Sequence, residues 1–335
     1  MSTGKFSYLS ANTFPIKIFL NRELIDNLLE KGLINSIHIQ LIPTNRCNFK
    51  CDFCSCANKK DSEELSFDDY LKIIDNAKRC GCKAVTITGG GEPLMHPRIG
   101  EIIDDLRKRK IKIGLTTNGS LISRLNKRQL DSMTWIRVSG GDSMSKNLKR
   151  VGIRSEQYWK NLSEAVKKAP KVDWSFSYVY TDKPDLKLMK EYVRFANKNK
   201  FAHVRITPDI LDLEHTRDIS KIKMSIQRAK IDDSKVVYQE RKSFEHGAKE
   251  CYISLLKPLI GADGYIYPCC GTQYAKKNPT RDNDPKMRIC KATEIDQFFK
   301  GKVPFDGSKC VKCYYNEYNI LLKTIIEGVN HQEFV

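Results

Sequence analysis

The sequence lacks the apolar run that a membrane-spanning helix requires. None of its 335 residues falls in an uncharged apolar stretch of about 18 residues, the length from which a transmembrane helix is predicted. Its first thirty residues also lack the uninterrupted apolar core of a signal peptide, because they contain Lys5, Lys17, Arg22, Glu23 and Asp26. We therefore expect a cytoplasmic protein with no membrane partner.

Acidic residues are scarce relative to basic ones. Asp and Glu number 40 against 58 Lys and Arg, which gives a formal net charge of +18. Such an excess attracts anions, so the substrate or its carrier is expected to be anionic: a nucleotide-linked or phosphorylated metabolite, a nucleic acid or an acidic peptide. The basic residues are dispersed along the chain, so a role in solubility explains the charge equally well.

Cysteine is too sparse for a disulfide scaffold, in which it makes up about 8–10% of the residues. The chain has 12 cysteines, and a reducing cytosol favours metal binding or catalysis for clustered thiols. They fall into groups: 47, 51, 54 and 56; 80 and 82; 251, 269 and 270; 290; 310 and 313.

Short apolar runs alternate with amphipathic stretches between Ile37 and about Thr207. The predicted strands are Ile37–Ile42, Ala84–Thr88, Ile111–Thr116, Trp135–Ser139, Trp174–Val179 and His203–Thr207. The predicted helices are Phe67–Arg79, Ile99–Arg109, Ser123–Gln129, Glu156–Lys168 and Leu186–Asn199. This alternation predicts an α/β fold with a parallel sheet, open or closed into a barrel. Functional loops then lie at the carboxyl ends of the strands.

Three cysteines follow the first predicted strand at the spacing C-x3-C-x2-C: Cys47, Cys51 and Cys54. Three thiolates on one loop can ligate three irons of a cubane cluster and leave the fourth iron open to another molecule. Zinc is the alternative, because Cys56 could supply the fourth ligand that a structural zinc site needs. A packing role for these thiols is the remaining alternative.

Three further motifs follow the next three strands. They are Thr88-Gly89-Gly90-Gly91-Glu92-Pro93, Thr116-Thr117-Asn118-Gly119 and Arg137-Val138-Ser139. Glycines let a backbone approach a ligand closely, although Asn-Gly alone is a common turn. In this order and spacing, the motifs resemble those of the radical S-adenosylmethionine (SAM) superfamily over roughly residues 37–207.

The resemblance implies a partial (β/α)6 barrel and a role for each motif. Cys47, Cys51 and Cys54 would hold a [4Fe–4S] cluster that binds SAM, and Phe53 would lie near the adenine. The remaining implied SAM contacts are Gly89, Gly90, Gly91, Glu92, Pro93, Thr117, Asn118, Ser139 and Arg150. Glu92 would compensate the SAM ammonium, and Arg154 is an alternative to Arg150. The family's SxDG-like element reads Ser139-Gly140-Gly141-Asp142 here, a departure that affects the expected ribose contacts.

The resemblance also implies the reaction. One electron from a donor such as flavodoxin or ferredoxin reduces the cluster, which cleaves SAM into methionine and a 5′-deoxyadenosyl radical. That radical then removes a hydrogen atom from the substrate, while the protein supplies binding, orientation and exclusion of water.

A second cysteine set has the pattern C-x12-G-x4-C followed by C-x2-C, formed by Cys251, Gly264, Cys269, Cys310 and Cys313. It resembles the auxiliary-cluster extensions called SPASM and Twitch, which implies one auxiliary [4Fe–4S] cluster on these four cysteines. A zinc ribbon is the alternative. Cys56, Cys270 and Cys290 stay unassigned, and Cys80 and Cys82 are expected to pack in the core.

The expected domains are an N-terminal extension (1–36), the partial barrel (37–230), a linker (231–250), a small Twitch-like domain (251–318) and a C-terminal helix (319–335). An auxiliary cluster favours net oxidation of the substrate. A redox-neutral epimerase or isomerase and a nucleic-acid-modifying enzyme are alternatives, and a zinc-stapled nucleic-acid-binding protein is an alternative of a different class.

Overall fold

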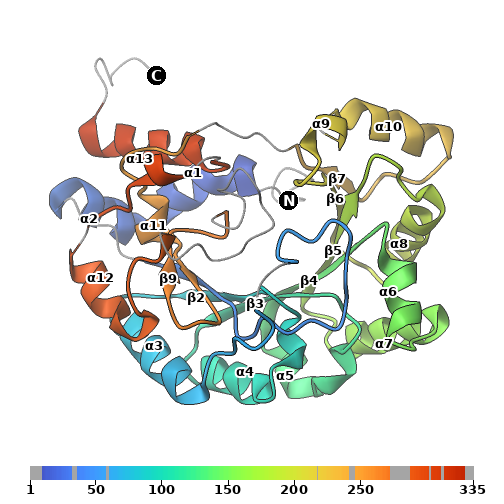
Figure 1. The fold of residues 1–335 in the computed structure, drawn as a ribbon, viewed down its shortest axis with the longest axis horizontal. Coiled ribbons are helices and arrows are strands. Elements are labelled where there is room, and N and C mark those ends of the chain that lie inside the picture. Colours follow the sequence, from blue (N-terminus) through green and yellow to red (C-terminus); the bar gives the residue numbers. More distant parts are fainter. Residues whose placement is uncertain are drawn as a thin grey trace.

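A single curved sheet organises the chain (Figure 1). The computed structural model describes residues 10–31, 36–57, 60–216, 218–240, 246–271, 287–301, 303–310 and 313–328. In these residues nine strands follow the order β7-β6-β5-β4-β3-β2-β1-β8-β9. Their bounds are β1 His38–Leu41, β2 Ala84–Ile87, β3 Lys112–Thr117, β4 Met133–Gly141, β5 Asp173–Tyr180, β6 His203–Pro208, β7 Val236–Tyr238, β8 Leu259–Ile260 and β9 Ile266–Tyr267.

The helices lie on both sides of this sheet. Those of the first two thirds of the chain are α1 Ser10–Leu20, α2 Arg22–Lys31, α3 Phe67–Arg79, α4 Ile99–Lys108, α5 Lys127–Asp131, α6 Met144–Arg150, α7 Ser155–Lys168, α8 Leu186–Lys198, α9 Leu213–Thr216 and α10 Ile219–Arg228. The rest are α11 Ile253–Leu256, α12 Ile295–Gly301 and α13 Asn316–Glu327. Figure 1 shows α3, α4, α5, α7 and α8 along the convex face, with α1, α2 and α13 on the other side. None of these helices has the length and apolarity to cross a bilayer.

Helix α3 illustrates why the predicted elements form. Ser66 caps its first turn by accepting a hydrogen bond from the Asp69 backbone N–H at 3.0 Å. Its first turn is acidic and its last turn basic, which suits the helix dipole. Tyr70, Ile73 and Ile74 are buried on one face, so the helix packs its apolar side against the sheet.

Strands β1 to β7 pair in parallel, and β8 pairs in parallel with β1. Alternate residues such as Ile39, Val85, Ile113, Ile136 and Val204 are buried in the main hydrophobic core beneath the outer helices. The parallel α/β fold expected from the sequence is therefore confirmed, and all six predicted strands are present within two residues at each end.

Three parts of the architecture differ from the expectation. The predicted helix Ser123–Gln129 is wrong, because Asn126 forms a capping box with Gln129 and starts α5 only at Lys127. The expected linker contains β7, which extends the sheet beside β6. Strand β8 joins the cysteine-rich C-terminal region directly to β1. The predicted C-terminal helix is present as α13 and begins at Asn316, and residues 329–335 lie outside the described residues.

Candidate functional site

The first three cysteines lie on the loop after β1, where the sequence predicts them. Cys47 is exposed, and Cys51 and Cys54 are half-buried. Burial, followed by the neighbouring Cys54 and Cys47, raises the pKa of the Cys51 thiol to about 12. The three thiols lie within eight residues of one another on this loop.

Asn147 of α6 fixes this loop from one side. Its amide oxygen accepts a hydrogen bond from the Lys50 backbone N–H at 2.7 Å, and its Nδ2 donates to the Cys51 sulfur at 3.5 Å. The same Nδ2 lies 3.0 Å from the Ser143 carbonyl, and Asn147 is only 1% exposed. Sequence reasoning missed Asn147, because α6 was not predicted and a single Asn on a basic helix carries no motif.

The glycine motif fixes the loop from a second side. The Gly91 N–H donates to the Thr44 carbonyl at 3.0 Å, and the Glu92 N–H donates to the Arg46 carbonyl at 2.8 Å. A Cβ atom at Gly91 would lie 1.9 Å from the Arg46 carbonyl oxygen, which no backbone tolerates. Glycine is therefore required here so that the motif can pack against the segment that leads into Cys47.

Glu92 is buried at 2% exposure and joins two strand ends. Its carboxylate accepts hydrogen bonds from the Thr117 hydroxyl at 2.6 Å, the Asn118 N–H at 2.6 Å and the Leu94 N–H at 3.1 Å. Burial raises the pKa of Glu92, and these donors oppose the rise. The motifs after β2 and β3 therefore meet at the Glu92 carboxylate, which accepts hydrogen bonds from protein donors. Its predicted role toward an ammonium stays a prediction.

A ring of amide and hydroxyl groups links the cysteine loop to β3. Asn118 Nδ2 donates to Asn48 Oδ1 at 2.9 Å, and Asn48 Nδ2 donates to Ser120 Oγ at 2.9 Å. Ser120 Oγ in turn donates to Asn118 Oδ1 at 2.6 Å, which closes the ring. Asn48 and Ser120 were not predicted, although each is adjacent to or near a predicted site residue in the sequence.

The end of β4 lies against Phe53. A Cβ atom at Gly141 would lie 2.6 Å from the Phe53 ring, so glycine admits the ring at this position. Ser139 is half-buried two residues earlier on the same strand. The element Ser139-Gly140-Gly141-Asp142 departs from the family pattern. Its Asp142 accepts hydrogen bonds from the Thr181 N–H at 2.8 Å and the Tyr178 hydroxyl at 2.6 Å. Asp142 therefore ties β4 to the loop after β5.

Arg150 and Arg154 lie near the site in sequence but face outward. Arg150 is the last residue of α6, and its side chain is exposed. Arg154 precedes α7 and is also exposed. Within the described residues, neither makes a hydrogen bond to the cysteine loop like that of Asn147, so the predicted contact with the SAM carboxylate stays a prediction.

His96 orders the loop after the glycine motif. It is 2% exposed, and its Nε2 lies 3.0 Å from the Leu65 carbonyl. The Arg98 N–H donates to His96 Nδ1 at 3.2 Å, so Nδ1 accepts and Nε2 carries the proton.

The four C-terminal cysteines line one small cavity of about 20 Å³: Cys251, Cys269, Cys310 and Cys313. Burial raises the pKa of each of these thiols, and several of them also raise one another's. Three N–H groups point at the sulfurs. Asn319 Nδ2 lies 3.8 Å from the Cys251 sulfur, the Gly271 N–H 3.2 Å from Cys269 and the Tyr315 N–H 3.4 Å from Cys313.

The other cysteines differ in their surroundings. Cys82 is buried in the main core and Cys80 packs against it, as predicted. Cys56 is buried, Cys290 packs against the core, and the Cys270 sulfur lies 2.9 Å from the Tyr315 hydroxyl. In the part of the chain that the structure describes, no three His, Cys, Asp or Glu side chains are arranged to hold a single metal ion.

The family model described as Radical SAM superfamily matches residues 41–185. That segment contains the cysteine loop, the glycine motif, the end of β3 and the end of β4, which the contacts above bring together. The match covers less than half of the chain, and this segment is therefore similar to the radical SAM superfamily.

Curated relatives resemble only part of this chain. The tungsten-containing aldehyde ferredoxin oxidoreductase cofactor-modifying protein of Pyrococcus furiosus is 34% identical over 88 residues, which are 26% of this chain and 25% of that protein. The GTP 3′,8-cyclase of Helicobacter pylori is 30% identical over 141 residues, 40% of this chain and 43% of that protein. The matches thus span between a quarter and less than half of these relatives.

Solved structures resemble the chain over a larger part of its length. Streptococcus suis SuiB bound to SAM has a TM-score of 0.55 at 20% identity, and the match covers 85% of this chain and 74% of that one. The enzyme anSMEcpe with bound SAM and a peptide has a TM-score of 0.53 at 12% identity, covering 89% and 86%. At these identities the likeness shows the fold, which is consistent with a partial barrel.

Proposed function

We propose that this chain is a radical SAM enzyme in which Cys47, Cys51 and Cys54 hold the SAM-binding [4Fe–4S] cluster. The observation that supports this most strongly is the convergence of three strand ends on one cysteine loop. Gly91 packs against the segment before Cys47, and Asn118 bonds to Asn48 directly after it. Three thiolates on one loop, with Cys47 exposed, suit a cubane with one open iron.

The chain's own residues would position SAM beside that cluster. Glycines 89–91 let the backbone approach the amino-acid end of SAM, and Phe53 against Gly141 offers an apolar face for the adenine. Glu92, Thr117 and Asn118 hold these loops in register through the buried carboxylate. When bound, the cluster and SAM supply one-electron reductive cleavage to methionine and a 5′-deoxyadenosyl radical, which abstracts a hydrogen atom from the substrate.

For the C-terminal cysteines the proposal is one auxiliary [4Fe–4S] cluster. Support comes from the shared cavity of Cys251, Cys269, Cys310 and Cys313 and from the N–H groups that point at three of the sulfurs. Buried thiolates are stable only with a compensating positive charge or with hydrogen-bond donors. A metal cluster supplies that positive charge. An auxiliary cluster can accept an electron from the substrate, so net oxidation is the proposed reaction type.

Metal analysis after anaerobic reconstitution tests the proposal. Two cubanes correspond to about eight irons per chain and to brown protein that absorbs near ~400 nm. In the presence of SAM and dithionite, 5′-deoxyadenosine should form. Colourless protein that binds zinc would instead support the zinc-stapled class, and about four irons per chain would remove the auxiliary cluster from the proposal.

A further inference from the structure

The outer face of α6 is basic. The helix buries Asn147 and Leu148 and exposes Lys146, Lys149 and Arg150. Because these three basic residues are three and four positions apart, they share one side of the helix. Figure 1 shows α6 at the rim of the barrel. The helix therefore turns a positively charged surface toward solvent.

Three contacts join this helix to the cysteine loop. The Asn147 amide oxygen accepts a hydrogen bond from the Lys50 N–H at 2.7 Å, and Asn147 Nδ2 donates to the Cys51 sulfur at 3.5 Å. Nearer to solvent, the Lys146 ammonium lies 3.3 Å from the Asp52 carboxylate, and both side chains are exposed. The basic face of α6 therefore adjoins the surface of the loop that carries the three cysteines.

Basic residues outnumber acidic ones on this surface. The segments 46–57 and 142–156 together contain six Lys and Arg residues and three Asp and Glu residues. Two of the three acids are engaged, because Asp142 is bonded to the loop after β5 and Asp52 pairs with Lys146. Few carboxylates are thus left to neutralise the basic residues.

Four exposed side chains account for the excess of positive charge. Arg46 pairs with Glu64 at 2.6 Å and does not contribute to it. The acid that remains is Glu156, which is exposed in the first turn of α7. Against it stand four exposed cations that form no ion pair with another described residue: Lys50, Lys149, Arg150 and Arg154. The surface therefore carries a positive charge that neighbouring carboxylates do not neutralise.

A surface of this kind suits a brief encounter with an acidic protein. Electron-transfer encounters bury little surface, and complementary charge mainly raises their rate of association. Since electron transfer slows steeply with distance, a donor must dock close to the group that it reduces. Cys47 is exposed, and α6 contacts the Cys51 sulfur. A carrier that docks on α6 is therefore close to the proposed cluster.

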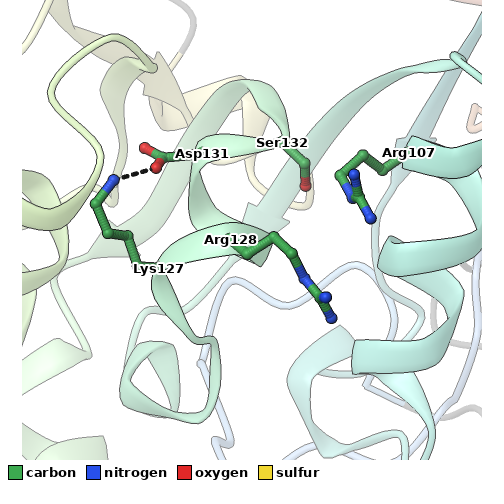
Figure 2. A pocket seen from close by; sticks show the side chains of 5 residues that line it. All are labelled: Arg107, Lys127, Arg128, Asp131 and Ser132. Atoms are coloured by element: carbon green, nitrogen blue, oxygen red, sulfur yellow. Dashed lines mark hydrogen bonds and ion pairs between the residues drawn. The ribbon is translucent and has the colours of Figure 1, made fainter.

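A second basic surface lies at the other end of the sheet (Figure 2). It is a hollow of about 630 Å³ lined by Arg107, Lys127, Arg128, Asp131 and Ser132. Figure 2 shows Lys127 paired with Asp131. Arg107 is in the last turn of α4, and α5 leads into the start of β4, whereas the cysteine loop follows the end of β1. This hollow is thus remote from the cysteines and serves as a control surface.

We propose that the outer face of α6, together with Lys50, is the docking surface for a small acidic electron-carrier protein. The inference rests on the proposed function, because the carrier supplies the electron that reductive SAM cleavage consumes. In the encounter the reduced carrier loses one electron to the cluster, and no covalent bond forms or breaks. A nucleic acid has the same sign of charge but no electron to donate, and this surface lies beside the group that needs one.

Binding of flavodoxin and of ferredoxin to the reconstituted full chain tests the inference. Each oxidised carrier is titrated anaerobically by calorimetry at low ionic strength. Lys146→Glu combined with Lys149→Glu should weaken binding at least about tenfold, because each change replaces an attraction by a repulsion. Added salt should bring the parent protein closer to this variant, since exposed charges are screened.

The matched control reverses two charges beside the outer hollow. Arg107→Glu combined with Lys108→Glu changes two exposed residues in the last turn of α4. Carrier binding should stay within about twofold of the parent protein, because exposed charges this far from the docking surface are screened. Equal losses in the α4 and α6 variants would show that only the net charge matters and would overturn the inference.

Electron transfer gives a second readout. The rate constant with which the chain oxidises flavodoxin hydroquinone should fall at least about tenfold in the α6 double variant at low salt. Dithionite is a small reductant that needs no docking surface, so with it the same variant should form 5′-deoxyadenosine within about twofold of the parent rate. Lys149→Gln removes one exposed charge and should slow the carrier reaction less, and it decides the test if the double variant does not fold.

The remaining outcomes are equally decisive. Binding of only one carrier through α6 would support the inference and identify the carrier as a flavin or an iron–sulfur protein. Binding of neither carrier would overturn it. Single-stranded RNA that binds through α6 while neither carrier binds would also overturn it, and would assign the surface to nucleic acid.

The result is separable from that of the proposed function. Parent protein that forms 5′-deoxyadenosine with dithionite but binds neither carrier keeps the proposed function and overturns the docking surface. Parent protein that binds flavodoxin through α6 but forms no 5′-deoxyadenosine overturns the proposed function and leaves the docking surface in place.

Discussion

The two cysteine sites use the same local device in different surroundings. At the barrel site, buried Asn147 accepts the Lys50 N–H and donates to the Cys51 sulfur. At the C-terminal site, buried Asn319 accepts the Ile253 N–H at 3.1 Å and donates to the Cys251 sulfur. Each asparagine clamps the backbone near one cysteine and directs an N–H at its sulfur.

The two sites differ in how their cysteines are distributed along the chain and in how far the protein encloses them. The barrel cysteines lie within one short loop that begins at exposed Cys47. The C-terminal cysteines come from three separate segments and enclose a cavity. A loop whose first cysteine is exposed leaves room for an outside molecule, whereas a cavity lined by four cysteines from separate segments favours complete coordination by the protein. We therefore expect ligand exchange at the first site only.

Removing one barrel ligand should have the largest effect. Cys51→Ala leaves two thiolates on the loop, so iron should fall from about eight to about four per chain and 5′-deoxyadenosine formation should be lost. Cys80→Ala removes a thiol that packs against the core and is the matched control. It should keep the iron content and the formation of 5′-deoxyadenosine. Iron analysis and chromatography of the SAM products measure the outcome. Parent-rate SAM cleavage by Cys51→Ala would contradict the ligand assignment.

Removing two C-terminal ligands should separate radical formation from product oxidation. In Cys310→Ala combined with Cys313→Ala, iron should again fall to about four per chain, while SAM cleavage persists and oxidised product vanishes. Circular dichroism and elution volume come first, because loss of soluble protein would mean that the metal only stabilises the fold. A soluble variant with full product formation would show that the C-terminal metal neither oxidises the substrate nor stabilises the fold.

A side chain at Gly91, where the glycine motif packs against the Arg46 carbonyl, should damage the barrel site alone. Gly91→Ala places a methyl group against the Arg46 carbonyl, and the strain should cost about 1–3 kcal/mol or displace the loop. We expect SAM affinity to fall by at least about tenfold, measured by equilibrium dialysis, while about four irons remain at the C-terminal site. Gly301→Ala meets no atom within 4 Å and is the control. Unchanged SAM affinity would show that the motif does not approach SAM.

The smallest expected effect concerns the two asparagines. An N–H donor stabilises the more negative, reduced state of a cluster, so its loss lowers the reduction potential. Asn147→Leu and Asn319→Leu should each lower the potential of their own cluster by roughly 40 mV, the equivalent of about 1 kcal/mol for one electron. Redox titration followed by electron paramagnetic resonance resolves the two clusters. A shift of both potentials by either variant would contradict separate sites.

Most of the barrel could be predicted from the sequence because its strands are apolar runs bounded by charged helices. The cysteine loop and the glycine motif were recognisable because their residue types leave few alternatives at that spacing. Asn147 and Asn319 were not, since each acts through one tertiary hydrogen bond that no local pattern encodes. Strands β8 and β9 are two residues long each, which is too short for alternation to show.

The pairing of β8 with β1 has a consequence for the order of assembly. Gln40 and Leu259, about 220 residues apart, lie side by side in the sheet. Contacts between such distant positions form late, because the closure of a long loop must come first. The first strand must therefore wait with one exposed edge until Leu259 and Ile260 have left the ribosome. Iron that reaches the N-terminal loop early would meet an incomplete sheet, whereas the C-terminal pocket can close only once that edge is covered.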